Sequence, residues 1–261
     1  PHVLTCGAFS FCTTVCYYFL MSEFEKKYPI SVFPVLKNLR EISDPPKQLY
    51  IRGEFPTSDL KFLTIVGSRK YTPYGKQACE RLIHELKGYP IVIVSGLALG
   101  IDAIAHKSAL RAGLTTVAVP GSGLDDSVLY PRTNKQLAQD ILQNDGALIS
   151  EFEPNWKPRP ESFPQRNRIM AGMSHAVMVI EAELRSGTLI TSRLATEYNR
   201  DVFAVPGPIH SSTSAGPNML IQKGAGLITC GKDILEAFNI DPESSKQQTL
   251  PLNLSANELK V

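Results

Sequence analysis

The sequence lacks any cluster of residues that commonly holds a metal ion. Its five cysteines include no CxxC pair, and its five histidines include no HExxH pair. We therefore expect no metal site. The odd number of cysteines and the apolar neighbours of Cys79 and Cys230 favour a reducing compartment, so the predicted location is cytoplasmic.

The sequence also lacks an excess of charge of either sign. Lysine and arginine number 27 against 25 acidic residues, which leaves a net charge of +2. Because no basic field covers the whole molecule, any nucleic-acid site must be a local basic patch.

Long hydrophobic runs are also missing. The apolar stretch at residues 8–21 is too short to span a bilayer, and it lacks the cationic start and cleavage site of a secretory signal. We expect no membrane insertion. Since Met21-Ser22-Glu23 resembles an ordinary bacterial start, we interpret residues 1–21 as a segment that is not native. The alternative is a genuine apolar helix packed on the domain.

The remaining chain divides into three parts. Residues 22–60 form a lead-in segment, with an edge strand predicted near residues 49–52 because the prolines before it stop regular structure. Residues 61–240 form the main domain. Residues 241–261 are polar and end in a helix-like pattern, which we interpret as the start of a truncated C-terminal domain.

The main domain repeats an apolar run followed by a helical pattern seven times. The expected strands are residues 62–67, 91–95, 115–119, 147–152, 176–182, 202–205 and 226–229. Continuous apolar strands imply burial on both faces, and helical crossovers imply parallel pairing. The predicted fold class is α/β, a doubly wound, mainly parallel sheet of the extended Rossmann-like type. A closed eightfold barrel is the alternative.

Turns rich in glycine and hydroxyl groups follow several of these strands. They contain the glycines Gly67, Gly96, Gly100, Gly121, Gly123 and Gly187. Glycine lets a backbone approach a phosphate closely, and the carboxyl ends of the strands meet at one edge of such a sheet. We predict an extended anion site there. For any single turn, the alternative is that glycine serves the turn geometry alone.

A basic cluster lies at Phe163-Pro164-Gln165-Arg166-Asn167-Arg168. We place it in the first turn of a helix, where unpaired backbone N–H groups and forked guanidinium groups both favour phosphate. Lys157 and Arg159 form a basic approach to it. The alternative is that an arginine is a structural partner of a carboxylate such as Glu151 or Glu181.

Cofactor and catalytic fingerprints are missing. The chain has neither a GxGxxG turn after the first main-domain strand nor a GK[ST] loop. It also has no GxSxG elbow and no nucleophile beside an evident base. Asp102 and His106 fall in a predicted helix, where capping and packing explain them. We therefore predict no cofactor and no enzymatic activity.

Seven ordered motifs span about residues 45–240. They are Val66-Gly67-Ser68-Arg69, Ser95-Gly96-Leu97-Ala98, Tyr130-Pro131, Ser150-Glu151, Phe163-Pro164-Gln165-Arg166-Asn167-Arg168, Ser186-Gly187-Thr188 and Val205-Pro206-Gly207. Together they resemble the DprA/Smf family of DNA-processing proteins. The resemblance implies a homodimer that binds single-stranded DNA without sequence preference. It also implies that the protein protects incoming DNA and loads RecA recombinase during natural transformation.

The resemblance also suggests which residues act. The implied DNA-binding residues are Ser68, Arg69, Lys70, Lys157, Arg159, Phe163, Arg166, Asn167, Arg168, Ser186, Gly187 and Thr188. Phe163 would stack on a base. The implied dimer interface is Asn218, Ile221, Gln222 and Leu227, although the apolar members also suit a core. Family members often carry a lysine shortly before the phenylalanine. This chain has Pro160-Glu161-Ser162 there, so Lys157 or Arg159 would replace that lysine.

Two other functions remain open. Lysine-decarboxylase-like phosphoribohydrolases share this sheet type and carry a PGGxGTxxE motif, whose glutamate takes part in the chemistry. In this sequence Thr191 stands at the glutamate position. The third possibility is a sensor of a small nucleotide that uses the same glycine turns.

Overall fold

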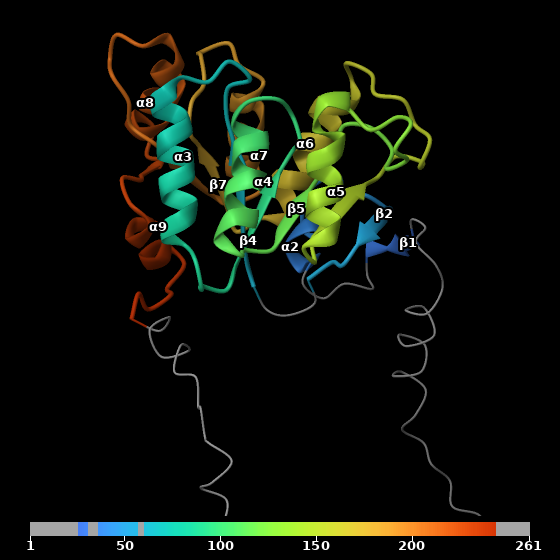
Figure 1. The fold of residues 1–261 in the computed structure, drawn as a ribbon. Helices are drawn as coiled ribbons and strands as arrows, with labels where there is room; N and C mark the ends of the chain where they lie inside the picture. The colour runs from blue at the N-terminus through green and yellow to red at the C-terminus, as the bar shows by residue number, and fades with distance from the viewer. Residues whose placement is uncertain (1–25, 31–35, 57–59, 244–261) are drawn as a thin grey trace, which may run out of the picture.

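The computed structural model describes residues 26–30, 36–56 and 60–243 (Figure 1). All seven predicted strands are present in it. They are β3 (Lys61–Val66), β4 (Ile91–Ser95), β5 (Thr116–Ala118), β6 (Ala147–Ser150), β7 (Ala176–Val179), β8 (Asp201–Ala204) and β9 (Gly226–Leu227). Strands β3 to β7 are short and almost wholly buried because helices cover both faces of the sheet, which explains their continuous apolar runs, whereas β9 at the outer end is exposed.

The sheet has nine strands within the described residues, in the order β1-β2-β6-β5-β4-β3-β7-β8-β9. Strands β3 to β9 all pair in parallel. From β3 the chain winds outward through β4, β5 and β6, and then returns to the other side of β3 to form β7, β8 and β9. The predicted doubly wound sheet is therefore confirmed. Its switch point, where ligands bind in open α/β sheets, lies between β3 and its neighbours.

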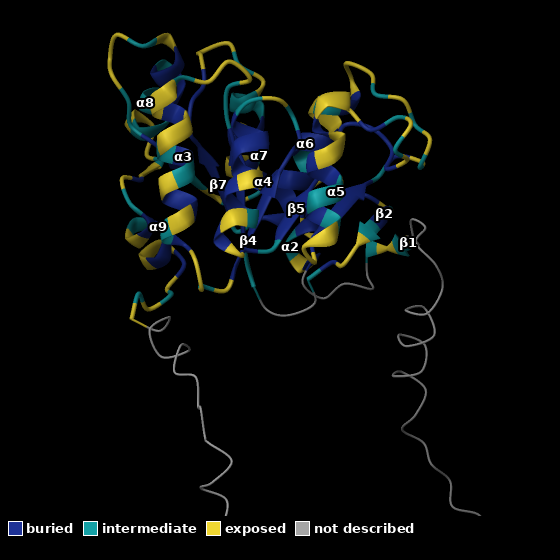
Figure 2. Ribbon diagram, in the orientation of Figure 1, coloured by how far each residue is buried: buried dark blue, intermediate teal, exposed yellow. Residues whose placement is uncertain are grey.

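Helices form a layer on each face of the sheet. The helices are α2 (Lys37–Arg40), α3 (Pro73–Glu85), α4 (Ile101–Ala112), α5 (Lys135–Gln143), α6 (Ser162–Met173), α7 (Thr188–Glu197), α8 (Ala215–Gln222) and α9 (Gly231–Ala237). Buried side chains of α3, α4 and α9 share one core cluster, and those of α2, α6 and α7 share another on the opposite face. Figure 2 shows the buried sheet between these layers and the exposed outer sides of the helices.

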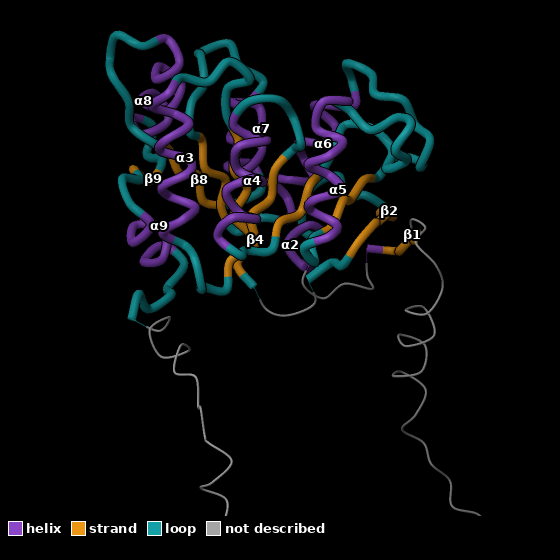
Figure 3. The backbone as a smooth tube through the Cα atoms, viewed as in Figure 1, coloured by secondary structure: helices purple, strands orange, loops and turns teal. Residues whose placement is uncertain are grey.

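The lead-in segment is part of the same sheet. β2 (Gln48–Gly53) pairs antiparallel with β6, and β1 (Lys26–Pro29) pairs antiparallel with β2. The predicted strand near residues 49–52 exists, but the prediction that it lies at the edge is wrong, because β1 covers its outer side. Figure 3 shows β1 and β2 at one end of the sheet and β9 at the other.

Some predictions concern residues beyond the described ranges. The interpretation of residues 1–21 lies outside them, as does that of most of the tail at 241–261. Among the residues that are described, no helix is both long and apolar enough to cross a bilayer. In the same part of the chain, no group of three or more histidine, cysteine, aspartate or glutamate side chains is placed to hold a metal ion.

Candidate functional site

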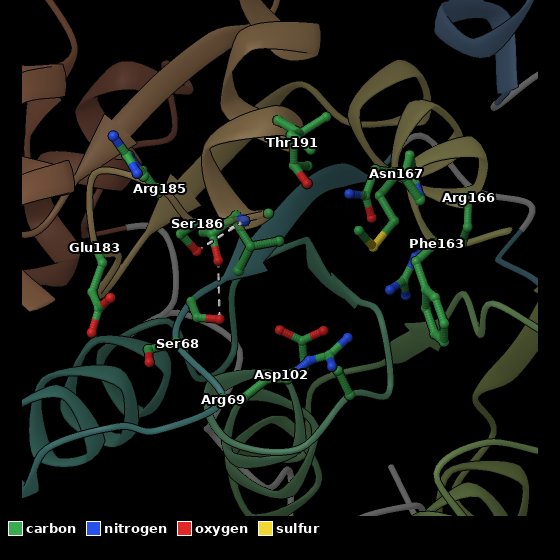
Figure 4. Close-up of a pocket in the computed structure, with 18 of the residues that line it drawn as sticks. Ser68, Arg69, Asp102, Phe163, Arg166, Asn167, Glu183, Arg185, Ser186 and Thr191 are labelled. Atoms are coloured by element: carbon green, nitrogen blue, oxygen red, sulfur yellow. Dashed lines mark hydrogen bonds between the residues drawn. The ribbon is translucent and has the colours of Figure 1, made fainter. Parts of the chain in front are cut away.

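A cleft of about 480 Å³ opens where β3 and β7 end. Its lining comes from the turn after β3, the start of α4, one face of α6 and the turn between β7 and α7. Figure 4 shows Glu183 and Arg185 on one side of this cleft and Phe163 and Arg166 on the other. The cleft therefore lies at the carboxyl ends of the strands around the switch point, where the sequence predicts an anion site.

Local hydrogen bonds hold the turn after β3. The Ser68 hydroxyl accepts from the backbone N–H of Lys70 at 3.0 Å, and Thr188 Oγ1 donates to the carbonyl of Gly67 at 3.2 Å. Ser186 Oγ in turn accepts from the N–H of Thr188 at 3.2 Å. The Arg69 and Lys70 side chains are exposed, and neither forms an ion pair within the described part of the chain. Two cations are thus presented on a fixed turn.

A buried arginine and a buried aspartate lie at the bottom of the cleft. Arg166 is 5% exposed and donates from Nη1 to the carbonyl of Val119, while its Nε has no hydrogen-bond partner in the described structure. Burial lowers the pKa of Arg166 to about 10, an effect that Asp102 opposes, so the group stays charged near neutral pH. Burial raises the pKa of Asp102, and Arg166 opposes that rise. Arg166 is therefore a buried cation at the bottom of the cleft, and its Nε is shielded from solvent.

An aromatic ring and a guanidinium group meet at one wall. The Arg69 guanidinium carbon lies 5.7 Å from the centre of the Phe163 ring, within the range of a cation–π contact. The Tyr130 ring meets Phe163 edge to face at 5.8 Å. Apolar rings beside unpaired cations suit a ligand with both flat rings and negative charge.

Comparison with known proteins gives the family. The model of the DNA recombination-mediator protein A family matches residues 20–239, which include the cleft and the sheet that carries it. The chain belongs to this family. The predicted resemblance to DprA/Smf proteins is therefore confirmed.

Relatives of this family support the assignment along most of the chain. DNA processing protein DprA of Streptococcus pneumoniae is 44% identical over 84% of this chain and 77% of its own length. Protein Smf of Escherichia coli is 43% identical over 74% of this chain, although the match spans only 51% of that longer protein.

Solved structures of family members have the same fold. The DNA processing protein A structure from Streptococcus pneumoniae has a TM-score of 0.76 and 40% identity, and the match covers 88% of this chain and 83% of that one. The one from Helicobacter pylori has a TM-score of 0.72 and 33% identity, and the match covers 84% of this chain and 98% of that one. The Helicobacter pylori protein is described as having a unique single-stranded DNA binding mode.

Most of the residues implied by the family resemblance gather at the cleft. Its lining includes Gly67, Ser68, Arg69, Lys70, Phe163, Arg166, Asn167, Ser186, Gly187 and Thr188. They come from the turn after β3, from α6 and from the turn that leads into α7, which lie far apart in sequence. Their role in DNA binding stays a prediction.

The helix start was predicted wrongly. α6 begins at Ser162, so Arg166, Asn167 and Arg168 lie in its second turn instead of its first. Backbone N–H groups there are paired within the helix, because only those of the first turn lack an intrahelical partner. The backbone N–H of Arg166 is therefore not an open donor, and only its side chain contributes to the lining of the cleft.

Arg168 lies outside the cleft. It forms an ion pair with Glu151 and another with Asp44 at 3.4 Å, and it donates to the carbonyl of Asp44 at 2.5 Å. Side chains two positions apart on a helix do not share a face, so Arg166 and Arg168 point to different sides. The structure thus gives Arg168 the alternative role considered from the sequence, that of a structural partner of Glu151.

Lys157 and Arg159 also lie outside the lining of the cleft. Both are exposed on the loop before α6, where the Arg159 guanidinium lies 4.9 Å from the centre of the Trp156 ring. The structure does not bring them together with Arg69, so it identifies neither as the replacement for the family lysine.

Steric packing explains four of the glycines that the sequence suggested for phosphate binding. A Cβ at Gly96 would lie 1.9 Å from Arg166 Nη1, and one at Gly121 would lie 2.7 Å from the Phe163 ring. A Cβ at Gly123 would lie 2.1 Å from the carbonyl of Pro154. Gly100 has a φ of +83° and lies against the Ser68 carbonyl. These glycines leave space for site residues and turns, as the alternative interpretation proposed.

Sequence reasoning missed three charged groups at the site. Asp102, Glu183 and Arg185 line the cleft. Arg185 is exposed in the Leu184-Arg185-Ser186 turn, next to residues that were selected. Its position in the turn between a parallel strand and the following helix was the available signal. Asp102 was interpreted only as a helix-start residue, and it does accept a hydrogen bond from the N–H of Gly96 at 3.1 Å.

Proposed function

We propose that this protein binds single-stranded DNA without sequence preference through the cleft, protects the strand and delivers it to RecA recombinase during natural transformation. Family membership and the described single-stranded DNA binding of the Helicobacter pylori relative support the proposal. The observation that carries it is the meeting of Arg69, Lys70 and Phe163 at one open cleft.

The cleft offers the two contacts that a single strand needs. Exposed Arg69, Lys70 and Arg185 neutralise phosphates, while the Phe163 ring offers a stacking surface for a base. A stacked base contributes about 1–3 kcal/mol whatever its identity, because every base has a flat face. Such contacts give affinity without sequence preference.

Salt should weaken this binding. Each phosphate neutralised on a single strand adds about −0.7 to the slope of log affinity against log salt concentration. Three exposed cations therefore predict a slope of about −2.1, or about 20-fold weaker binding on going from roughly 50 to 200 mM salt.

The direct test is fluorescence anisotropy with a labelled oligothymidine, using Lys70→Glu as the variant and Lys87→Glu as its matched control. Lys87 is exposed in the turn between α3 and β4, at the amino end of the strands and away from the cleft. We expect Lys70→Glu to weaken binding about tenfold or more and Lys87→Glu to leave it unchanged. Equal losses in both variants would contradict a local site.

The same preparation tests the other two functions. Thr191, at the position of the phosphoribohydrolase glutamate, is buried and lines the cleft, but a hydroxyl is a poor general acid or base near neutral pH. We expect no base release from AMP by chromatography and no competition between AMP and the oligothymidine. Base release would support the hydrolase, and competition without release would support a nucleotide sensor.

Self-association is proposed at the β9 end of the sheet. Leu227 is 50% exposed on this outer strand, and Gln222 is exposed at the end of α8, with Ile221 half-buried beside it. Asn218 is engaged within the chain, since its side chain bonds the N–H and carbonyl of Gly207 at 3.2 and 3.0 Å. In light scattering, Leu227→Asp should convert a dimer to a monomer because it places a charge in an apolar contact.

The recombinase step needs a test of its own. In an assay of RecA filament growth on oligothymidine, wild-type protein should shorten the lag and Lys70→Glu should not, because the variant holds the strand weakly. If wild-type protein binds the strand but does not shorten the lag, RecA loading is contradicted and DNA binding is not.

A further inference from the structure

A second, smaller hollow adjoins the cleft. Its volume is about 20 Å³, and it shares Arg69, Ala98 and Phe163 with the cleft. The other residues around it are Gly96, Leu99, Tyr130 and Pro131. A ligand that leaves the cleft past Phe163 would therefore reach Tyr130 and Leu99 next.

The side chains at this hollow are large, apolar and exposed. Tyr130 is 43% exposed and Leu99 is 47% exposed. The Tyr130 ring makes an angle of 62° with the Phe163 ring. The two rings therefore do not cover each other face to face, and the Tyr130 hydroxyl has no hydrogen-bond partner in the described structure.

The turn that carries Leu99 is held firmly. Asn134 is buried and donates from Nδ2 to the carbonyls of Leu97 at 2.8 Å and Ala98 at 3.1 Å. Leu97 has a φ of +57° and is fully buried. Because the surface is fixed before a ligand arrives, binding there loses little conformational entropy.

One exposed cation borders this surface, and another follows Tyr130 closely in the chain. Arg69 borders it on the cleft side, and Arg132, two residues after Tyr130, is exposed and has no ion pair within the described residues. Two neighbouring aromatic rings, Phe163 and Tyr130, thus lie next to Arg69, and Arg132 follows Tyr130 two residues later in the chain. That arrangement suits a chain of phosphates and bases better than an apolar protein segment.

We propose that Tyr130, supported by Leu99, is a second stacking position for a nucleobase of the strand bound in the cleft, and that Arg132 contacts the next phosphate. The inference rests on the proposed function, since it extends the path of the same single strand. The inference also gives the strand a path over the surface, from the turn after β3 across α6 toward α5.

The test uses oligothymidines with 2-aminopurine placed at successive positions, because stacking on an aromatic ring quenches its fluorescence. Wild-type protein should quench 2-aminopurine fluorescence at two nearby positions of the strand, because one base stacks on Phe163 and another on Tyr130. Tyr130→Ala should remove one of the two and weaken binding by about 5- to 140-fold, whereas Tyr130→Phe should keep both. Leu99→Glu, at an exposed position, should also weaken binding because its carboxylate repels the strand.

The outcomes separate this inference from the function on which it rests. One outcome is that wild-type protein binds oligothymidine, Lys70→Glu weakens that binding, and Tyr130→Ala and Leu99→Glu change neither affinity nor quenching. The second stacking position is then wrong, and the proposal that the cleft binds the strand is retained. That result would indicate that the exposed pair contacts a protein instead. If wild-type protein does not bind oligothymidine, both proposals fail.

Discussion

The two faces of α6 serve different parts of the molecule. On one face, Phe163 and Arg166 line the cleft. On the other, Arg168 binds Glu151 and Asp44, and Gly172 lets Leu39 and Ile42 approach the helix closely. One short motif therefore contains a binding surface and an anchor for the lead-in segment. The difference shows that residues adjacent in a motif need not share a role, because a helix turns neighbouring side chains to different sides.

Arg200 strengthens the anchoring side. Its guanidinium donates to the carbonyl of Asn38 at 2.8 Å and lies 3.8 Å from Glu41, both in or next to α2. Two arginines thus hold the lead-in segment against the α6–α7 layer. The predictions below test whether the two faces of α6 can be separated by experiment.

The largest effect is expected at Arg166. Arg166→Ala removes the cation that faces buried Asp102, and an unpaired buried charge costs about 3–5 kcal/mol. Urea unfolding should show most of this loss near neutral pH, together with weaker oligothymidine binding. Wild-type stability and affinity in this variant would show that Arg166 neither stabilises buried Asp102 nor contributes to strand binding.

Arg168 should affect stability without affecting binding. Arg168→Ala leaves the half-buried Glu151 without its strongest partner, which should cost about 1–3 kcal/mol in urea unfolding. Affinity for oligothymidine should stay within about threefold of wild type, since the side chain lies outside the cleft. In a double-mutant cycle, adding Glu151→Gln should recover part of the stability, because the unpaired charge is removed. A large loss of affinity in a folded Arg168→Ala variant would contradict the separation of the faces.

Acid should act on the protein through His106, which is fully buried in α4, one helical turn after Asp102. Burial lowers the pKa of His106 from 6.5 to about 3, so the native imidazole is neutral where the unfolded one is charged. Stability should therefore fall as pH falls from 6.5 toward 3, by up to about 1.4 kcal/mol per pH unit. His106→Gln should have a flatter pH dependence than wild type over this window. Parallel curves for the two proteins would show that folding does not lower the pKa of His106.

The smallest effect is expected from neutralising one exposed cation. Lys70→Gln should reduce the salt slope of oligothymidine binding by about 0.7, the contribution of one phosphate. Arg168→Ala serves as the control and should leave the slope unchanged. An equal change in both variants would mean that long-range charge, and not contact, governs the slope.

The sequence was sufficient for the main sheet because its signal is local. The central strands are mostly apolar runs, and burial on both faces requires such runs. β1 was missed since its residues Lys26–Pro29 carry no such pattern and are ordered by pairing with β2. Because β1 pairs with the outer side of β2, β2 is not the edge strand of the sheet.

The site could be predicted in part. Arg69 and Phe163 were identified from their motifs, but nothing in the local sequence distinguishes Arg166 from Arg168. Their difference depends on Asp102 and Glu151, which belong to distant segments. The local sequence around Gly96 and Gly121 likewise predicts phosphate-binding turns. In the structure, the Arg166 and Phe163 side chains occupy the space that a Cβ at these positions would fill.

The amino-acid sequence by itself determined the alternation of strands and helices, the family and the rim of the sheet where the site lies, because periodicity and strand ends are properties of short segments. Only the tertiary structure decided which cations are available to a ligand and which are engaged by internal carboxylates. That choice depends on burial and on partners brought together from α4, from α6, from the segment before β2 and from the residue after β6, and no short segment contains both members of such a pair.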